Sequence, residues 1–315
     1  MKFSIAIPAY KGKYIYKAIE SVLCQTYQDY ELVIVDDCSP EDLKSIIDKF
    51  HDPRIRYYRN NKNCGSINVV DNWNICLSYC TGQYVICMGD DDCLTPCCLE
   101  EYKKLIDKYP ELDIYHAWTE IIDENGKIKS LQQPRPEFES GLSLMWNRWN
   151  GRDRQFIGDF CFKIETLRYN GGFYKLPLAW ASDDISAVRA AMSKGIANLQ
   201  VIGFQYRDSG ITITNSSNHD IKLNAAFLER KWYKQLYSTI DKNTLNSIDK
   251  IYHFMMRTEI DRHFYCQRRT CLVNIFRYNP SKIFSYLTKR TQLEISLILL
   301  VNYWLEGVKM RLYRR

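Results

Sequence analysis

Several features that mark whole classes of protein are missing from this chain of 315 residues. There is no low-complexity tract and no internal repeat, which excludes a repeat solenoid and predicts order nearly throughout. No apolar segment of signal-peptide length precedes Pro8 and no small-residue cleavage site follows it, so we expect no secretory leader. The Walker A and G-x-G-x-x-G patterns are also missing, which disfavours P-loop and dinucleotide-binding enzymes.

Paired cysteine motifs are missing as well, although the chain has twelve cysteines. Seven of them lie between Cys64 and Cys98, yet no C-x-x-C occurs and no histidine stands nearby to complete a zinc set. Cysteines in apolar segments are more often small buried hydrophobic residues than partners in disulfides, and free thiols of this kind are typical of a reducing compartment. We therefore predict reduced thiols and a cytoplasmic location.

What the first third does contain is an alternation of strand-like and helix-like segments. Short apolar runs predict strands over residues 3–7, 31–35, 55–59, 84–88 and 113–117. Apolar spacing of three and four predicts helices between them, over residues 15–24, 41–50, 67–79 and 98–109. This alternation favours an α/β fold with a mainly parallel sheet, whose ligands bind beyond the carboxyl ends of the strands.

The second half is less regular. Glu124 to Lys127 predicts a hairpin turn, and residues 132–158, without a clear period, predict a loop over a cleft. A strand over 160–164, a helix over 184–193 and a strand over 198–206 follow. From residue 218 the pattern is helical, so we place a domain boundary after residue 217.

The most informative stretch is Gly89-Asp90-Asp91-Asp92, directly after the apolar run 84–88. Three adjacent carboxylates repel one another, so their position at the tip of a buried strand indicates a neutralising partner. A divalent cation such as Mg²⁺ or Mn²⁺ is the simplest one, because hard oxygen ligands suit these ions. The alternative is an acidic turn that only caps the helix expected after Pro96.

The order and spacing of four segments carry a resemblance to a known family. They are Ile7 to Tyr10, Val33 to Ser39, Asn60 to Gly65 with the helix that carries Asn72, and Thr81 to Asp92. Because of these four segments, the chain over about residues 1–215 resembles the inverting glycosyltransferases of family 2, which have the GT-A fold. The resemblance implies a Rossmann-like catalytic domain over 1–217, with a nucleotide-sugar half (1–118) and an acceptor half (119–217), followed by a helical region over 218–315.

The resemblance also implies the donor site. Asp36 matches the carboxylate that accepts a hydrogen bond from the base, and Asp92 and Asp91 match the metal-binding carboxylates of the DXD-type motif, although Gly89 stands where the commonest form has an acid. The implied cofactor is Mn²⁺ or Mg²⁺. The residues implied to bind the nucleotide sugar are Pro8, Ala9, Tyr10, Asp36, Asp37, Asn63, Gly65, Asn72, Asp90, Asp91 and Arg207.

On the acceptor side, Asp183 matches the position of the catalytic base, with Ser182 in place of the usual Glu. A carboxylate at a helix N-terminus is held by backbone N–H groups and the helix dipole, which suits a base aimed into a cleft. The alternative is that Asp183 or Asp184 only caps the helix. The other residues implied on this side are Gly171, Gly172, Phe173, Trp180 and Asp184, although a tryptophan in such a sequence is more often a core residue.

These residues together predict a metal-dependent inverting transfer of a hexosyl or N-acetylhexosaminyl group. The donor would be a nucleotide-diphosphate sugar, with UDP expected, and the acceptor a hydroxyl of a saccharide or lipid-linked saccharide in polysaccharide or glycolipid synthesis. Two alternatives stay open: a sugar-1-phosphate nucleotidylyltransferase and a non-catalytic nucleotide-binding protein of the same fold. Nucleic-acid binding is disfavoured, because no binding motif accompanies the basic residues.

Those basic residues gather near the C-terminus. Residues 282–315 hold seven lysines and arginines against two glutamates. The apolar runs 295–301 and 303–305 are too short and interrupted to span a bilayer. We hypothesise peripheral attachment to an anionic membrane surface, on its cytoplasmic face, with Trp304 and Tyr313 at the headgroups. The alternative is an ordinary helix that packs on the catalytic domain.

Overall fold

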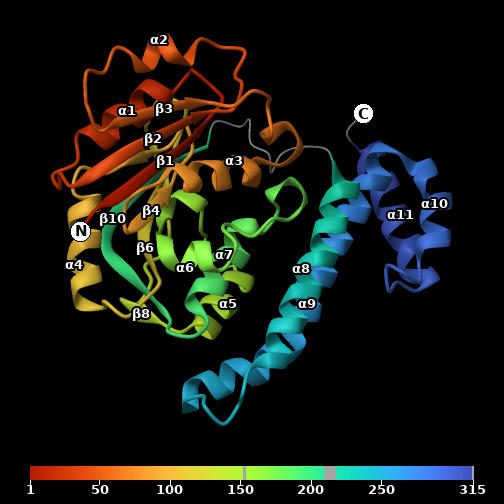
Figure 1. The fold of residues 1–315 in the computed structure, drawn as a ribbon. Coiled ribbons are helices and arrows are strands. Elements are labelled where there is room, and N and C mark those ends of the chain that lie inside the picture. Colours follow the sequence, from red (N-terminus) through yellow and green to blue (C-terminus); the bar gives the residue numbers. More distant parts are fainter. Residues whose placement is uncertain (152–153, 209–217, 314–315) are drawn as a thin grey trace. The chain divides into compact units, whose positions relative to one another are not determined.

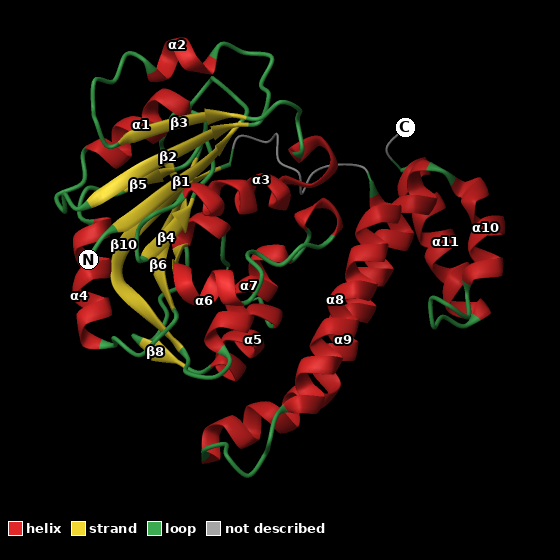
Figure 2. Ribbon diagram, in the orientation of Figure 1, coloured by secondary structure: helices red, strands yellow, loops and turns green. Residues whose placement is uncertain are grey.

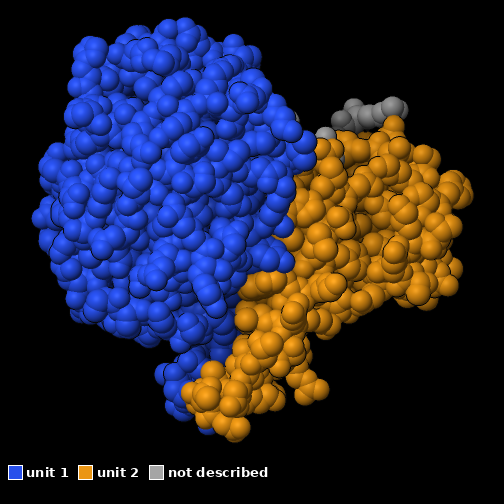
Figure 3. Space-filling model, viewed as in Figure 1, with its two compact units in different colours: residues 1–175, 181–212, 246–252 blue, residues 176–180, 213–245, 253–315 orange. Residues whose placement is uncertain are grey.

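The structure is a computed structural model that describes residues 1–151, 154–208 and 218–313. Its contacts divide the chain into two compact units, coloured separately in Figure 3. The sheet unit comprises residues 1–175, 181–212 and 246–252, and the helical unit comprises residues 176–180, 213–245 and 253–315. The boundary predicted after residue 217 lies outside the described residues.

One mixed sheet forms the centre of the sheet unit (Figures 1 and 2). Its main path runs β3-β2-β1-β4-β9-β6-β10-β5, with β7 on β6 and β8 on β10. The strands are β1 (Phe3–Ala9), β2 (Tyr30–Asp36), β3 (Ile55–Arg59), β4 (Tyr84–Cys87), β5 (Cys93–Leu94), β6 (Ile114–Ile122), β7 (Ile128–Leu131), β8 (Phe138–Glu139), β9 (Phe160–Lys163) and β10 (Ile196–Arg207).

Helices cover both faces of this sheet. In Figures 1 and 2, α1 (Ile15–Leu23) and α4 (Cys98–Lys108) lie on one face, and α3 (Gly65–Tyr79), α6 (Ile164–Tyr169) and α7 (Ser182–Ala191) lie on the other. A continuous core joins the first layer to the inward side chains of the strands, such as Ile5 and Ile7. Because each such side chain gains about 1.5–3 kcal/mol on burial, the apolar runs of the sequence decide where the strands lie.

The predicted parallel order holds for β1, β2, β3 and β4, and for β6 with β10. It does not hold in the middle of the sheet, where β9 runs antiparallel to both β4 and β6. A strand with both faces buried has the same apolar pattern whichever way it runs, so the sequence did not reveal this direction.

Two local predictions have clear outcomes. The hairpin after β6 is confirmed, since β6 and β7 pair antiparallel and Gly126 has a φ of +87°, a conformation that glycine adopts without strain. The expectation of a structureless loop over 132–158 is wrong, because α5 (Gly141–Trp149) forms inside it. Ser140 caps that helix by accepting a hydrogen bond from the N–H of Ser143 at 3.1 Å. All twelve cysteines carry free thiols, as predicted.

The helical unit is built from α8 (His219–Thr239), most of α9 (Ser247–Tyr278), α10 (Ile283–Lys289) and α11 (Leu297–Leu312). Its core joins these helices through side chains such as Leu223, Leu272, Phe276 and Leu300. Among the residues that the structure describes, no helix combines the length and apolar character needed to cross a membrane.

Candidate active site

The acidic turn lies where parallel strands end together. Ala9 at the end of β1 is opposite Asp36 at the end of β2, and Ala6 of β1 is opposite Cys87 of β4. This register brings the loop after β1 beside the turn at residues 89–92. The predicted convergence at the carboxyl ends of these strands is therefore present in the structure.

Asp90 fastens the two loops to each other. Its Oδ2 accepts hydrogen bonds from the backbone N–H groups of Tyr10 and Lys11, each at 2.7 Å. The carboxyl group is buried, and burial raises the pKa of Asp90 to about 6 although the two N–H donors act to lower it. Asp90 therefore holds the loop after β1, which begins with the exposed Tyr10, beside the acidic turn, whereas Pro8 and Ala9 are the last two residues of β1.

Asp91 and Asp92 approach the same point beside Gly89. A Cβ atom on Gly89 would lie 2.8 Å from Asp92 Oδ2 and 2.9 Å from Asp91 Oδ1. Burial raises the pKa of both carboxyl groups, and for Asp92 the charge of Asp91 raises it further. Glycine is needed at position 89 because any side chain there would occupy the space between the two carboxylates.

This pair fits a divalent cation by its chemistry. Two carboxylates that face one space are hard oxygen ligands, and mutual repulsion is what a cation would relieve. Among the described residues, no group of three or more histidine, cysteine, aspartate or glutamate side chains could hold a metal ion. Mg²⁺ is commonly bound through one or two carboxylates together with substrate phosphates, so a pair is sufficient.

Arg207, at the end of β10, holds the acidic turn through hydrogen bonds. Its backbone N–H donates to Asp92 Oδ1 at 2.9 Å, and its Nε donates to the carbonyl of Asp91 at 2.8 Å. Its guanidinium also donates to the carbonyl of Asp123 at 2.9 Å and lies 4.5 Å from the ring of Tyr14. Arg207 is 2% exposed and is in contact with the acidic turn, and its role in binding the nucleotide sugar stays a prediction.

The second acidic pair, Asp36 and Asp37, is also tied into the protein. Asp36 is fully buried; its Oδ2 accepts from the hydroxyl of Tyr57 at 2.8 Å and from Arg59, and its Oδ1 accepts from the N–H of Ser39 at 2.7 Å. Contact between Asp36 and a base stays a prediction, and it would require a carboxylate that already has these donors to accept one more.

Asp37 joins the loop before α3 to the end of β2. Burial acts to raise its pKa, but hydrogen bonds from the thiol and N–H of Cys64, from Asn60 and from the N–H of Gly65 lower it below the ordinary value. A Cβ on Gly65 would lie 2.8 Å from Asp37 Oδ2. Asn72 completes the network by accepting from Asn60 at 3.1 Å, and Asn63 lies in the loop between them.

Asp183 lies in the first turn of α7. Ala181, the residue before the helix, has a left-handed φ of +56°, and Asp183 Oδ1 accepts the N–H of Asp184 at 3.0 Å. Burial and the neighbouring Asp184 raise the pKa of Asp183 to about 7, against a lowering effect of Arg148. A general base works best with a pKa near the working pH, so Asp183 has the right acidity for that role.

Asp184 is the member of the pair that the protein neutralises. Its Oδ1 accepts from Arg148 Nε at 2.8 Å and from the side-chain amide of Gln155. Gln155 accepts in turn from the buried Arg135 at 3.1 Å. These three residues lie in or beside the segment expected to be a loop, and no pattern in the sequence connects them to α7, so sequence reasoning missed them.

The Gly171-Gly172-Phe173 loop is held against α3. A Cβ on Gly172 would lie 2.3 Å from Asn74 Oδ1, and that oxygen accepts the N–H of Phe173 at 2.8 Å. The ring of Phe173 is 2% exposed and packs edge-on against Trp73 and Phe162. Phe173 therefore supports the loop from the core. Trp180 belongs to the helical unit, where Lys222 Nζ lies 5.2 Å from its ring centroid.

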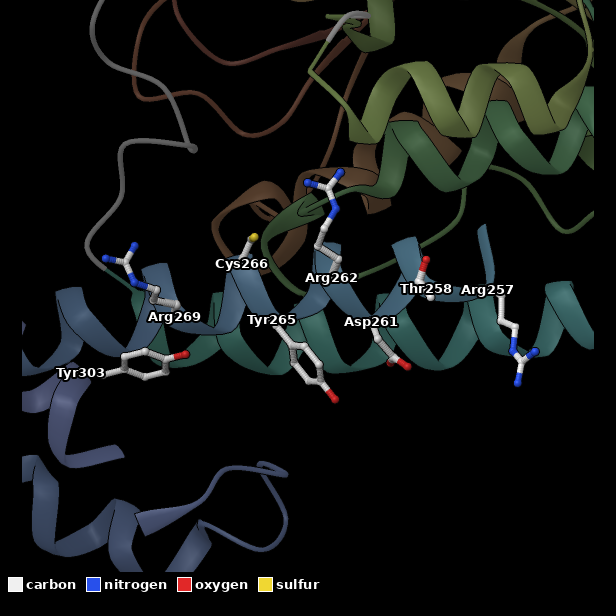
Figure 4. Close-up of a pocket in the computed structure, with 8 residues that line it drawn as sticks. All are labelled: Arg257, Thr258, Asp261, Arg262, Tyr265, Cys266, Arg269 and Tyr303. Atoms are coloured by element: carbon white, nitrogen blue, oxygen red, sulfur yellow. The ribbon is translucent and has the colours of Figure 1, made fainter. Parts of the chain in front are cut away.

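A shallow hollow of about 540 Å³ lies on the helical unit and contains none of the predicted site residues. In Figure 4, Arg257 and Arg262 point to opposite sides of α9, and Arg262 and Arg269 are bound to Glu259 and Glu306. The cationic groups do not converge on one point. The residues that line the hollow are Arg257, Thr258, Asp261, Arg262, Tyr265, Cys266, Arg269 and Tyr303.

Comparison with known sequences identifies one family. The profile of Glycosyl transferase family 2 matches residues 4–173. The chain is 31% identical over 136 residues to an uncharacterized glycosyltransferase of Rickettsia typhi, which covers 42% of this chain and 41% of the relative. It is 38% identical over 96 residues to the putative colanic acid biosynthesis glycosyl transferase WcaA of Escherichia coli K12, which covers 30% of this chain and 33% of the relative. It is also 38% identical over 135 residues to Escherichia coli chondroitin synthase, which covers 40% of this chain and 18% of the relative. The chain thus spans between 18% and 41% of the length of these relatives.

Solved structures extend the likeness of fold to the whole chain. The crystal structure of S. aureus TarS residues 1–349 in complex with UDP-GlcNAc matches with a TM-score of 0.67 and 16% identity, over 99% of this chain and 92% of that one. TarS is a GT-A-like protein, and the match includes the helical region after the sheet. The GT-A fold with a helical C-terminal part, predicted from the sequence, is confirmed.

Proposed function

Because this chain belongs to glycosyl transferase family 2, we propose that it transfers a sugar from a UDP-sugar to an acceptor hydroxyl with inversion at the anomeric carbon. The family makes it a glycosyltransferase related to polysaccharide-synthesis enzymes, which sets aside the nucleotidylyltransferase alternative. This proposal includes the identities of the donor nucleotide, the metal, the catalytic base and the acceptor.

The donor binds, in this proposal, at the carboxyl ends of β1, β2 and β4. Pro8 at the end of β1 and Tyr10 in the loop after it pack beside the base, and the loop anchored by Asp37 lies on the β2 side of β1. Support comes from the register that aligns these strand ends and from the exposed ring of Tyr10. The solved TarS structure is titled as a complex with UDP-GlcNAc, which favours UDP as the first nucleotide to test.

Asp91 and Asp92 would hold the divalent cation, Mn²⁺ or Mg²⁺. When bound, the cation neutralises charge that develops on the diphosphate leaving group, an electrostatic contribution of several kcal/mol. The protein's own part is positional. Arg207 and Gly89 fix the two carboxylates at the space that they share, and Asp90 fixes the loop opposite, so the site is preorganised before a donor arrives.

Asp183 takes the proton from the acceptor hydroxyl as that oxygen attacks the anomeric carbon. The bond to the leaving phosphate breaks on the opposite side, so one displacement inverts the configuration. The observation that carries this role is the contrast within the pair: Asp184 is bound to Arg148 and Gln155, whereas the pKa of Asp183 is raised to about 7. A carboxyl group that only caps a helix would have its pKa lowered by the N–H groups it accepts from.

The acceptor is a saccharide, and we infer a lipid-linked one because the helical unit carries the features of a membrane-surface protein described below. The location that follows is peripheral, on an anionic membrane surface facing the cytoplasm. The sugar moved would be a hexose or an N-acetylhexosamine, as in the polysaccharides for which two of the relatives are named.

Slow donor hydrolysis tests the proposal without knowledge of the acceptor. The pure protein is incubated with a panel of UDP-, GDP- and dTDP-sugars and Mn²⁺, and nucleotide release is measured. We expect one UDP-sugar to be turned over, activity to disappear in EDTA, and Mn²⁺ or Mg²⁺ to restore it. Turnover that is equal with and without EDTA would exclude the metal, and a preference for GDP- or dTDP-sugars would exclude the nucleotide assignment.

A further inference from the structure

Helix α11 has two apolar faces, of which only one packs within the helical unit. On the packed face, Leu300 is fully buried and the indole N–H of Trp304 donates to the carbonyl of Pro280 at 3.0 Å. Gly307 lies so close to α9 that a Cβ there would be 2.6 Å from the carbonyl oxygen of Val273. The indole N–H of Trp304 is therefore bound inside the unit, and the place of this partly exposed residue at a headgroup interface stays a prediction.

The second apolar face is open. Ile298, Val301, Leu305 and Leu312 are 75%, 38%, 43% and 63% exposed. Their spacing of three, four and seven places them along one side of the helix. An exposed apolar stripe of this kind, here interrupted by Lys309 between Leu305 and Leu312, marks a contact with another molecule or with lipid. We call these four residues the α11 stripe.

Exposed basic residues lie on α11 itself and at the end of the helix before it. Lys309 and Arg311 are exposed on the same helix, and Lys289 and Arg290 are exposed at the end of α10. The two glutamates of residues 282–315 are already bound by arginines of the neighbouring helices, Glu294 by Arg230 at 2.7 Å and Glu306 by Arg269 at 2.5 Å. The helical unit as a whole holds 17 lysines and arginines against seven acids, a formal net charge of +10.

We propose that the α11 stripe docks on an anionic lipid bilayer, with α11 lying in the plane of the interface. An apolar stripe flanked by lysine and arginine matches the two layers of such a surface, acyl chains below and negative headgroups above. A second copy of the chain is the less suitable occupant, because it would bring an equal positive charge to the same place. A helix of 16 residues is about 24 Å long, which is shorter than a bilayer core, so α11 lies on the membrane rather than across it.

Vesicle co-sedimentation tests the proposal independently of the donor, the metal and the base. The full chain is spun with vesicles of phosphatidylcholine alone and of phosphatidylcholine with phosphatidylglycerol. The variants are Ile298→Gln with Leu305→Gln, which removes the stripe, and Lys309→Gln with Arg311→Gln, which removes charge. Glutamine keeps helix propensity. The matched control is Ile128→Gln with Leu131→Gln, which replaces two exposed aliphatic side chains on β7 of the sheet unit.

We expect binding only to the phosphatidylglycerol vesicles, a fall of at least tenfold in the partition coefficient for each variant, and no change for the control. Raising the salt concentration should also release the parent protein, a readout that needs no variant. Equal sedimentation of the parent and the stripe variant would overturn the proposal. So would a parent that is dimeric in solution beside a monomeric stripe variant, because the stripe would then be an interface between copies.

Discussion

The two units of this chain differ most in their net charge and in the surroundings of their acidic residues. The sheet unit holds 26 basic and 30 acidic residues, a formal net charge of −4, whereas the helical unit has +10. In the sheet unit, carboxyl groups such as Asp90, Asp92 and Asp159 are buried with raised pKa values. In the helical unit, Asp261 and Glu294 are bound by Arg230. Buried acids with raised pKa values cost stability, so their concentration in one unit supports the proposal that the chemistry is done there.

The largest expected effect is on the acidic turn. Asp92→Asn keeps an oxygen that can accept the N–H of Arg207 but removes the negative charge facing Gly89. We expect donor hydrolysis in Mn²⁺ to fall about 10³-fold, in the range seen when one preorganised charge contact is lost. The melting temperature should not fall, because the substitution removes a buried carboxyl group whose pKa is raised. Asp107→Asn on α4, an exposed carboxylate, is the matched control. Full activity in Asp92→Asn would remove this residue from the metal site.

The next effect is on the proposed base. Asp183→Asn still accepts the N–H of Asp184 but cannot take a proton. We expect hydrolysis to fall about 10²-fold while UDP binding, measured by calorimetry, stays within a factor of two. Asp184→Asn is the informative partner, and its effect should be smaller. If Asp184→Asn were the more damaging change, the roles of the two carboxylates would be reversed.

Asp183→Asn should also raise the stability of the protein, although it lowers the activity. The pKa of this carboxyl is near 4 in the unfolded chain and about 7 in the folded protein. Folded protein therefore loses stability as pH rises from 4 to 7, and the full penalty is present above pH 7. Urea unfolding should show Asp183→Asn to be more stable by about 1–3 kcal/mol at pH 8 and equal to the parent at pH 4. Equal stability at pH 8 would mean that the pKa of Asp183 is not raised.

Much of the sheet unit could be predicted from the sequence, because buried strands leave apolar runs and their ends carry unusual residues such as Asp90 to Asp92. The direction of β9 could not, since an apolar run has no direction. Helix α5 was missed because Gly141 and Pro-rich surroundings outweighed the cap at Ser140. The support of Asp184 by Gln155 depends on residues 29 positions apart meeting in space, which no local pattern contains.

The smallest expected effect on turnover comes from the helical unit. Gly307→Ala would bring a Cβ to 2.6 Å from the carbonyl of Val273 and 2.9 Å from the N–H of Arg277, both backbone atoms. We expect a loss of about 1–3 kcal/mol in the stability of the helices, read from the ellipticity at 222 nm during unfolding. Donor hydrolysis at 20 °C should stay unchanged. In the control variant Asn302→Ala, at an exposed position of the same helix, both the stability and the hydrolysis should stay unchanged. Lost turnover with intact helices would show that the helical unit contributes to the chemistry.

The direct test of the central claim, a single displacement driven by the acids of the sheet unit, is the configuration of the released sugar. The UDP-sugar preferred by the enzyme, with its α-linked phosphate, is hydrolysed in an NMR tube, and the anomeric proton is followed before mutarotation. Our account predicts that the β-anomer appears first and that Asp183→Asn abolishes this early signal. Early release of the α-anomer would contradict it.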